Sequence, residues 1–169
     1  MTDSVSRTRH DDQPATAVPP SVLVVPLNYA GEVLFTHAPA IDGGPAGREL
    51  ALPFAWLADG DDPAQAAMRA LQSATGFRAE AVFPLGALAP FGRWATGDVH
   101  LFLARNLEPA GGIGAAAFGA QTERVPFGDL ETLIAAGRLR DATLIAALFI
   151  ARQAIAGHIR FDDEGAQHG

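Results

Sequence analysis

The sequence predicts a mixed α/β (α+β) domain in which a mixed β-sheet is sandwiched between helices. Short apolar runs rich in Val and Leu fill much of the first two thirds of the chain, and turn residues separate them. Helix signals occur once in the middle and twice near the C-terminus. The 169 residues, 49% hydrophobic and 18% charged, suit one domain with one sizeable core. This order of elements favours a layered sandwich.

The strands are predicted from apolar runs bounded by turn chemistry. They cover residues 22–27, 32–37, 48–54, 77–88, 99–104 and 123–127. Residues 28–31 (Asn-Tyr-Ala-Gly) form a turn that joins the first two strands into a hairpin. Because Pro26 has no N–H to donate, we expect its strand to lie at a sheet edge or to bulge there. Residues 38–47 and 109–122 are rich in Gly, Pro or Ala and are expected to be loops.

Each predicted helix begins at an Asp and ends at a Gly. Asp62 can cap a helix that Pro63 starts and Gly76 ends, because Pro suits the first helical position. A short helix begins near Asp129, and a longer one, residues 142–156, follows Asp141. The last helix is apolar on most of its faces. It is therefore either largely buried or half of a subunit contact.

Composition excludes several classes of chemistry. The chain has no Cys, which excludes disulfides, thiolate catalysis and Cys-ligated zinc. All twelve cationic side chains other than His are Arg, so neither a Schiff-base Lys nor a P-loop is present. The net charge of −7 gives no field that would attract nucleic acid. No apolar run approaches the roughly 18 residues that would cross a bilayer.

The ends of the chain are polar and differ from the middle. Residues 1–20 lack the apolar stretch of a signal peptide and are expected to be a disordered tail. Residues 21–157 would form the folded domain, and residues 158–169 would form a C-terminal tail. We expect a cytoplasmic protein that contacts neither nucleic acid nor membrane.

One segment carries a specific pattern. Residues 52–79 read LPFAWLADGDDPAQAAMRALQSATGFRA. This segment resembles the Nudix box, whose pattern is G, five residues, E, seven residues, then R-E-U-x-E-E-x-G-U, with U aliphatic or aromatic. Aligned without gaps, the chain matches the pattern at Arg69, Leu71, Gly76 and Phe77. It departs from the pattern at the remaining positions, which are Ala55, Asp61, Ala70, Ser73 and Ala74.

The resemblance extends over roughly residues 21–156. The opening hairpin, the strands at 77–88 and 99–105, and the end from Gly137 to the last helix are similar to the ADP-ribose pyrophosphatase branch of the Nudix hydrolases. The resemblance implies the Nudix fold, a nucleoside diphosphate sugar such as ADP-ribose as the substrate class, magnesium or manganese if the protein is active, and a homodimer.

The box has lost the carboxylates that the family uses for chemistry. Positions 70, 73 and 74 lie at i, i+3 and i+4 and share one helix face. In the family this face presents Glu side chains to the metals, whereas here it presents two methyl groups and one hydroxyl. Magnesium requires oxygen ligands, so the usual metal site cannot assemble. Ala51 also stands where the family often has a Glu before the helix. The sequence predicts weak or no pyrophosphohydrolase activity.

Few side chains remain as site candidates. Glu123 and Asp61 are the candidate catalytic acids, and Asp61 and Glu49 are weak candidates for holding a metal. The structural alternatives are a helix cap for Asp61, a pairing of Arg69 with Asp59 or Asp61, and a surface carboxylate for Glu49. Arg48, Glu49, Arg93 and Trp94 are the candidate substrate-binding residues, through bidentate or stacking contacts. Either Arg could equally be a surface residue. His37 lies near a position where the family often has a substrate-contacting Arg.

Three functions remain open from the sequence. The first is a non-catalytic Nudix-fold protein that binds a nucleotide-linked ligand or a protein partner. The second is an active hydrolase that builds its metal site from substitute acids such as Asp61, Glu49, Asp98 and Glu123. The third is a structural domain that dimerises through its apolar last helix. A concave pocket beside the helix of the box, lined by Arg or aromatic side chains, would favour the first, and a pocket filled by Phe54 or Trp56 would favour the third.

Overall fold

The computed structural model describes residues 15–39, 48–90, 92, 95–111 and 122–159. Its elements in chain order are β1 (Thr16–Ala17), β2 (Ser21–Pro26), β3 (Glu32–Pro39), β4 (Arg48–Ala51), β5 (Phe54–Trp56), α1 (Pro63–Thr75), β6 (Phe77–Leu88), β7 (Ala95–Thr96), β8 (Val99–Pro109), β9 (Glu123–Pro126), the 3₁₀ turn η3 (Phe127–Asp129), α3 (Leu130–Ala135) and α4 (Ala142–Ile155). None of the helices in these ranges is long and apolar enough to cross a membrane.

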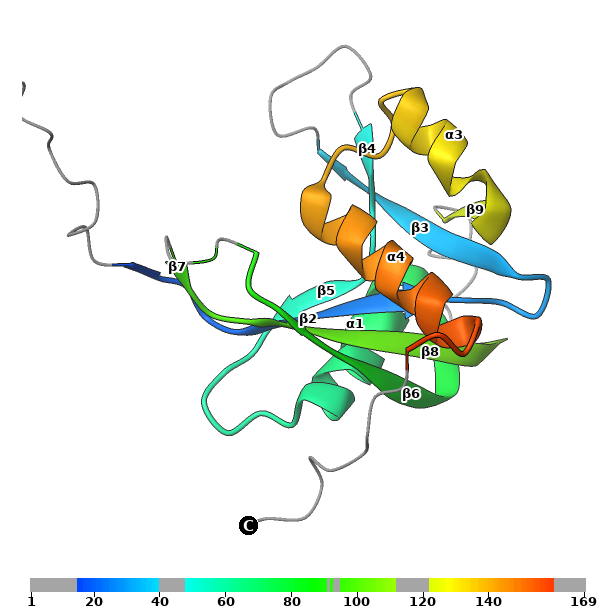
Figure 1. The fold of residues 1–169 in the computed structure, drawn as a ribbon. Coiled ribbons are helices and arrows are strands. Elements are labelled where there is room, and N and C mark those ends of the chain that lie inside the picture. Colours follow the sequence, from blue (N-terminus) through cyan, green and yellow to red (C-terminus); the bar gives the residue numbers. More distant parts are fainter. Residues whose placement is uncertain (1–14, 40–47, 91, 93–94, 112–121, 160–169) are drawn as a thin grey trace, which may run out of the picture.

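The strands form one larger and two smaller sheets. The four-stranded sheet has the order β5-β2-β8-β6, and its central pair, β2 and β8, is parallel. The three-stranded sheet has the order β4-β3-β9 and is antiparallel throughout. The third sheet is a parallel pair of two-residue strands, β1 and β7, which projects from the body of the domain (Figure 1).

Helices cover both faces of the sheet layer, which confirms the predicted sandwich. Side chains alternate along β2, so that Val22 and Val24 point toward α1 and Leu23 and Val25 point toward α4. All four are at most 2% exposed. Figure 1 shows α3 and α4 in front of the strands and α1 behind them. The apolar cores therefore lie in two layers, one on each side of β2 and β8.

Helix α1 is bounded as its sequence predicts. The Asp62 side chain accepts a hydrogen bond from Ala64 N at 2.9 Å, and Pro63 occupies the first turn. Gly76 ends the helix with φ 72°, a left-handed conformation that glycine adopts without strain. These two caps fix the helix in the register that places Leu71 in the core at 0% exposure.

The strand predicted at residues 48–54 is wrong as one element. The chain pairs with β3 from Arg48 to Ala51, then leaves that sheet and pairs with β2 from Phe54 to Trp56. Pro53 lies between the two segments and cannot donate a ladder hydrogen bond, although its carbonyl accepts from Val24 N at 2.9 Å. This segment therefore links the two sheets.

Pro26 does not place its strand at a sheet edge, since β2 has neighbours on both sides. It is the last residue of β2, and the pairing with β5 ends three residues earlier, at Leu23. No ladder hydrogen bond toward β5 is therefore required of the Pro26 nitrogen. On the other side, Pro26 stands in regular register with Ala104 of β8. The expectation of an edge strand or a bulge was wrong because a proline at a strand terminus removes no ladder bond.

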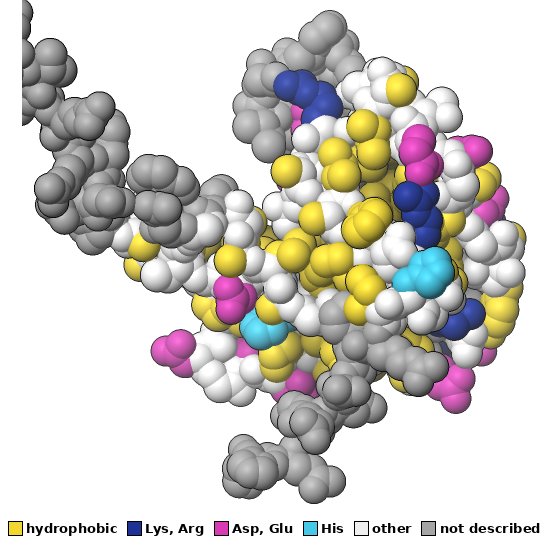
Figure 2. Space-filling model, in the orientation of Figure 1, with side chains coloured by type: hydrophobic (Ala, Val, Ile, Leu, Met, Phe, Trp, Pro, Cys, Tyr) yellow, Lys and Arg dark blue, Asp and Glu magenta, His cyan; other side chains and the backbone are white. Residues whose placement is uncertain are grey.

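Helix α4 is buried on one side and exposes apolar side chains on the other. Leu144, Ala147, Leu148 and Ala151 are buried against the sheet. On the outer side, the exposed fraction of Phe149 is 53%. Figure 2 shows hydrophobic side chains gathered over this outer side of α4. The helix is both a core element and an apolar surface.

We expect Leu71→Ala to lower the free energy of unfolding by about 2–5 kcal/mol, because it leaves a cavity beneath α1. Gln72→Ala, at the exposed neighbouring position, should change it by no more than about 0.5 kcal/mol. Urea unfolding followed by circular dichroism measures both. Equal effects of the two substitutions would contradict the packing described for α1.

Candidate functional site

The face of α1 that corresponds to the family's carboxylates carries no ligand for a metal. Ala70 is 6% exposed and packs in the apolar cluster between α1 and the sheet. Ser73 is exposed, and Ala74 is half-buried. Magnesium binds through several oxygen ligands, and this face offers only one hydroxyl oxygen. The residues present therefore do not fit a magnesium or manganese site at this position.

Asp61 is engaged within its own loop. Its Oδ2 accepts a hydrogen bond from Ala58 N at 2.9 Å, and its Oδ1 lies 3.7 Å from Nη2 of Arg69. Of the two partners that the sequence offered to Arg69, Asp59 and Asp61, the structure pairs it with Asp61. One oxygen of Asp61 bonds within the loop before α1 and the other faces Arg69 on α1, so Asp61 ties this loop to the helix. The cap of α1 is Asp62 and not Asp61.

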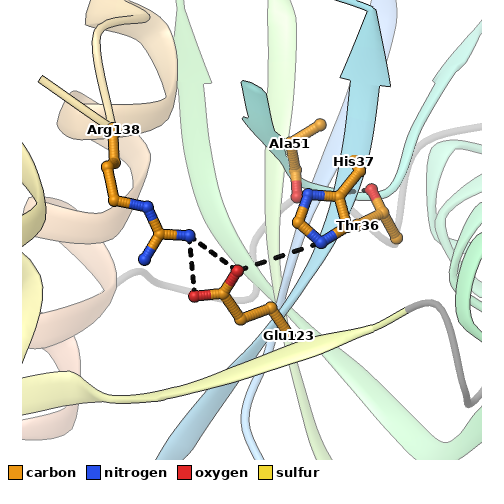
Figure 3. Close-up of polar contacts among 5 residues, drawn as sticks. All are labelled: Thr36, His37, Ala51, Glu123 and Arg138. Atoms are coloured by element: carbon orange, nitrogen blue, oxygen red, sulfur yellow. Dashed lines mark hydrogen bonds and ion pairs between the residues drawn. The ribbon is translucent and has the colours of Figure 1, made fainter. Parts of the chain in front are cut away.

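Glu123 of β9 forms the centre of a polar cluster with Arg138 and His37 (Figure 3). Nη2 of Arg138 donates to both Glu123 oxygens, at 2.9 Å and 2.7 Å. These hydrogen bonds raise the pKa of Arg138 above its usual value. Nε2 of His37 lies 3.9 Å from Oε2 of Glu123, and the buried Nδ1 of His37 has no hydrogen-bond partner among the residues that the structure describes. Arg138 lies in the segment between α3 and α4, so the cluster ties that segment to β3 and β9.

A second Arg from the same segment holds Glu49. Nη1 of Arg140 lies 3.7 Å from Oε1 of Glu49 on β4. The positions of the other predicted substrate-binding side chains are not described. The backbone of Arg48 belongs to β4, but its side chain is not among those described. Arg93 and Trp94 lie outside the described residues. Glu49 is therefore placed beside a cation of its own chain.

The candidate acids are not brought together. Asp61 lies in the loop before α1, Glu123 on β9 and Glu49 on β4, and each is paired with a different Arg. Within the described ranges, no group of three or more His, Asp or Glu side chains could hold a metal ion. The substitute site that an active hydrolase would need does not form among these side chains.

The structure contains an apolar hollow that sequence reasoning did not locate. It has a volume of about 160 Å³ and lies between the edge of the four-stranded sheet and the first turn of α4. Phe54 and Trp56 of β5 line it, with ring centroids 4.9 Å apart and ring planes at 88°. Their exposed fractions are 43% and 57%, so the two rings border the hollow and do not fill it.

The hollow lies on the α4 side of the sheet, away from the Nudix-box helix. Phe54 and Trp56 stand opposite Leu23 and Ser21 in the β2–β5 pairing and share their face, whereas Ala55 faces α1. The spacing of two residues between the aromatic side chains was a signal for a shared face. The sequence alone did not show that Asp141, at the start of α4, would lie beside them.

Comparison with known proteins establishes the fold. No family model matches the sequence, and no curated protein is significantly similar to it. Among solved structures, the crystal structure of an ADP compounds hydrolase matches with a TM-score of 0.67 and 21% sequence identity. The match covers 84% of this chain and 75% of the hydrolase chain. This likeness shows the fold alone, which is consistent with the Nudix fold that the sequence predicted.

We expect Ala70→Glu to lower the free energy of unfolding by about 1–3 kcal/mol, because a carboxylate would enter a closed apolar cluster. Ser73→Glu, on the exposed side of the same helix, should change it by no more than about 0.5 kcal/mol. The urea midpoints of the two variants test this difference. If Ala70→Glu left the free energy of unfolding unchanged, position 70 would have to open to solvent.

Proposed function

We propose that this chain is a Nudix-fold binding protein that does not carry out metal-dependent pyrophosphate hydrolysis, and that its ligand is a small molecule linked to a nucleoside diphosphate. The observation that carries the proposal is the face of α1, where Ala70 is buried and Ser73 offers the single oxygen. Hydrolysis of the family's kind needs a divalent cation to neutralise phosphate charge and to activate water. This helix provides no carboxylate for that cation.

The pairing of the remaining acids supports the loss of activity. A carboxylate that is bound to an Arg is already neutralised and would have to break that pair to ligate a metal. Glu123 accepts two hydrogen bonds from Arg138, and Asp61 and Glu49 each lie 3.7 Å from an Arg nitrogen. These ion pairs hold loops and strands in place, so the three carboxylates have structural roles in this proposal.

The ligand class is supported by the fold and by the hollow beside α4. A solved structure with the same fold is described as an ADP compounds hydrolase, and ADP is a nucleoside diphosphate. The hollow is concave and mostly apolar, with aromatic side chains at its border, as small-molecule sites commonly are.

We also propose that the protein is a homodimer that associates through α3 and α4. A groove of about 150 Å³ runs between these helices, and Ile134 and Phe149 border it at 42% and 53% exposure. Arg152 hydrogen-bonds Glu131 at the rim and thereby lowers the pKa of Glu131. A two-fold contact would set this patch against its own copy, so that the exposed apolar side chains of the two chains would bury one another.

The activity experiment incubates the purified protein with ADP-ribose and either magnesium or manganese and measures product by chromatography. We expect no turnover above the protein-free control. Titration calorimetry of ADP-ribose should give the same affinity with and without a chelator, because binding does not involve the metal.

Turnover that a chelator abolishes would establish the alternative, an active hydrolase with substitute carboxylates. In that case Glu123→Gln or Asp61→Asn would abolish the turnover. Glu80→Gln, which removes an exposed acid on β6, serves as the matched control.

The dimer experiment compares Phe149→Glu with Phe83→Glu, since Phe83 on β6 is exposed to a similar extent, 50%. Light scattering after size exclusion should give twice the monomer mass for the unmodified protein and for Phe83→Glu, and a monomer for Phe149→Glu, because the new charge cannot be desolvated in the contact. A monomeric unmodified protein, or a dimer that Phe149→Glu leaves intact, would exclude this interface.

A further inference from the structure

A second concave surface lies at the end of the sheet opposite the hollow. The hollow borders Ser21, the first residue of β2, whereas the second surface borders Tyr29, in the turn that follows β2. Its volume is about 250 Å³, and its lining is mostly polar. The lining residues come from this turn, the start of β6 and the end of β8: Tyr29, Arg78, Ala79, Glu80, Asn106 and Glu108. We call this surface the β6–β8 pocket.

The aromatic side chain of the pocket stands on a rigid turn. Oδ1 of Asn28 accepts hydrogen bonds from Ala30 N and Glu32 N, both at 2.9 Å. Nδ2 of Asn28 donates to Oε2 of Glu32 at 2.8 Å. Although the turn is fixed in this way, the exposed fraction of Tyr29 is 78%. An aromatic ring on such a support loses little conformational freedom when a ligand contacts it.

The pocket carries one unbalanced negative charge. Arg78 and Glu108 stand opposite each other in the β6–β8 pairing, and Nη2 of Arg78 lies 3.5 Å from Oε2 of Glu108. Glu80 forms no hydrogen bond or ion pair with any residue that the structure describes. Because the charges of Arg78 and Glu108 offset each other, the carboxylate of Glu80 selects a ligand with a positive charge.

The side-chain amide of Asn106 adds a neutral acceptor to the pocket. Asn106 has a φ of 55°, the only positive φ of a non-glycine residue within the described ranges. Asn adopts this left-handed conformation more readily than most residues do. Its amide oxygen makes no hydrogen bond to another described residue. The pocket therefore offers two acceptors, from Glu80 and Asn106, to the N–H donors of a cation.

The exposure of the pocket distinguishes one kind of cation from another. A divalent metal needs several oxygen ligands, and the described residues contain no group of three His, Asp or Glu side chains that could hold one. An ammonium group is strongly hydrated, so an exposed site gives it little that water does not. A guanidinium group is more weakly hydrated, stacks on aromatic rings and meets a carboxylate with two parallel N–H groups. Tyr29 and Glu80 provide these two contacts.

From these features we propose that the β6–β8 pocket binds a guanidinium group carried by a small molecule. Glu80 is its charge partner, the ring of Tyr29 is the stacking surface, and Asn106 accepts a further hydrogen bond. Since this pocket and the hollow share no lining residue, the inference goes beyond the proposed function and does not depend on the binding of ADP-ribose.

The test compares butylguanidinium with butylammonium, which have the same charge and the same tail and differ only in the head group. Ligand-observed NMR titrations at low ionic strength, extended to millimolar concentrations, measure both affinities for the unmodified protein. Butylguanidinium should bind at least about threefold more tightly, since only its head group both stacks and forms two parallel hydrogen bonds. Equal affinities, or no binding of butylguanidinium, would overturn the proposal.

Substitutions of Glu80 and Tyr29 test the two contacts separately. Glu80→Gln should weaken butylguanidinium at least about fivefold, because it removes the charge that the ligand pairs with. Asp59→Asn changes the net charge equally at an exposed position before α1 and should leave the affinity unchanged. Tyr29→Leu should weaken binding about two- to fivefold, whereas Tyr29→Phe keeps the ring and should retain it. If Asp59→Asn weakened binding as much as Glu80→Gln, the attraction would be to net charge alone and the site would be excluded.

A third compound identifies the source of the guanidinium group. N-acetylarginine methylamide carries the same head group between two peptide groups, as an Arg side chain of a protein partner does. Weaker or equal binding of this compound relative to butylguanidinium supports a small-molecule ligand. Markedly tighter binding, lost in Glu80→Gln, would assign the pocket to a protein partner and overturn the small-molecule proposal.

Discussion

The structure depends on the burial of both faces of the parallel pair β2 and β8. Because side chains alternate along a strand, these two strands must supply apolar groups to two separate cores at once. Val22 and Val24 meet α1, whereas Leu23 and Val25 meet the side of α4. The helices need only one apolar face each, so the rest of their surface is available for caps, ion pairs and contacts.

At position 70, the absence of a carboxylate and the close packing of α1 are one feature of the helix. A Glu at position 70 would need water or a cation beside it, whereas Ala70 joins the apolar cluster with Leu71 and Leu34. Three ion pairs connect segments of the chain: Arg69 with Asp61, Arg138 with Glu123, and Arg140 with Glu49.

The sequence predicted the elements whose ends are set by capping residues close in the chain, and it missed those that depend on tertiary contacts. Asp62, Pro63 and Gly76 act within a few bonds of α1, so local rules were sufficient. The split between β4 and β5 depends on which sheet offers a partner on either side of Pro53, and no local rule contains that information. The Arg69–Asp61 pair was predicted because it spans one loop and one helix. The Arg138–Glu123 pair and the hollow join segments far apart in sequence, and therefore they appeared only in the structure.

The wall of the hollow that Val18 and Pro19 provide has a thermodynamic consequence. These residues connect the projecting β1–β7 pair to β2, so the hollow is complete only while the start of the described chain is docked. A ligand that fills the hollow binds the docked state and not the released one. By mass action, ligand and docked segment then stabilise each other, and the first strand detaches less often when the hollow is occupied. Resistance of this segment to limited proteolysis would thus report whether the hollow is occupied.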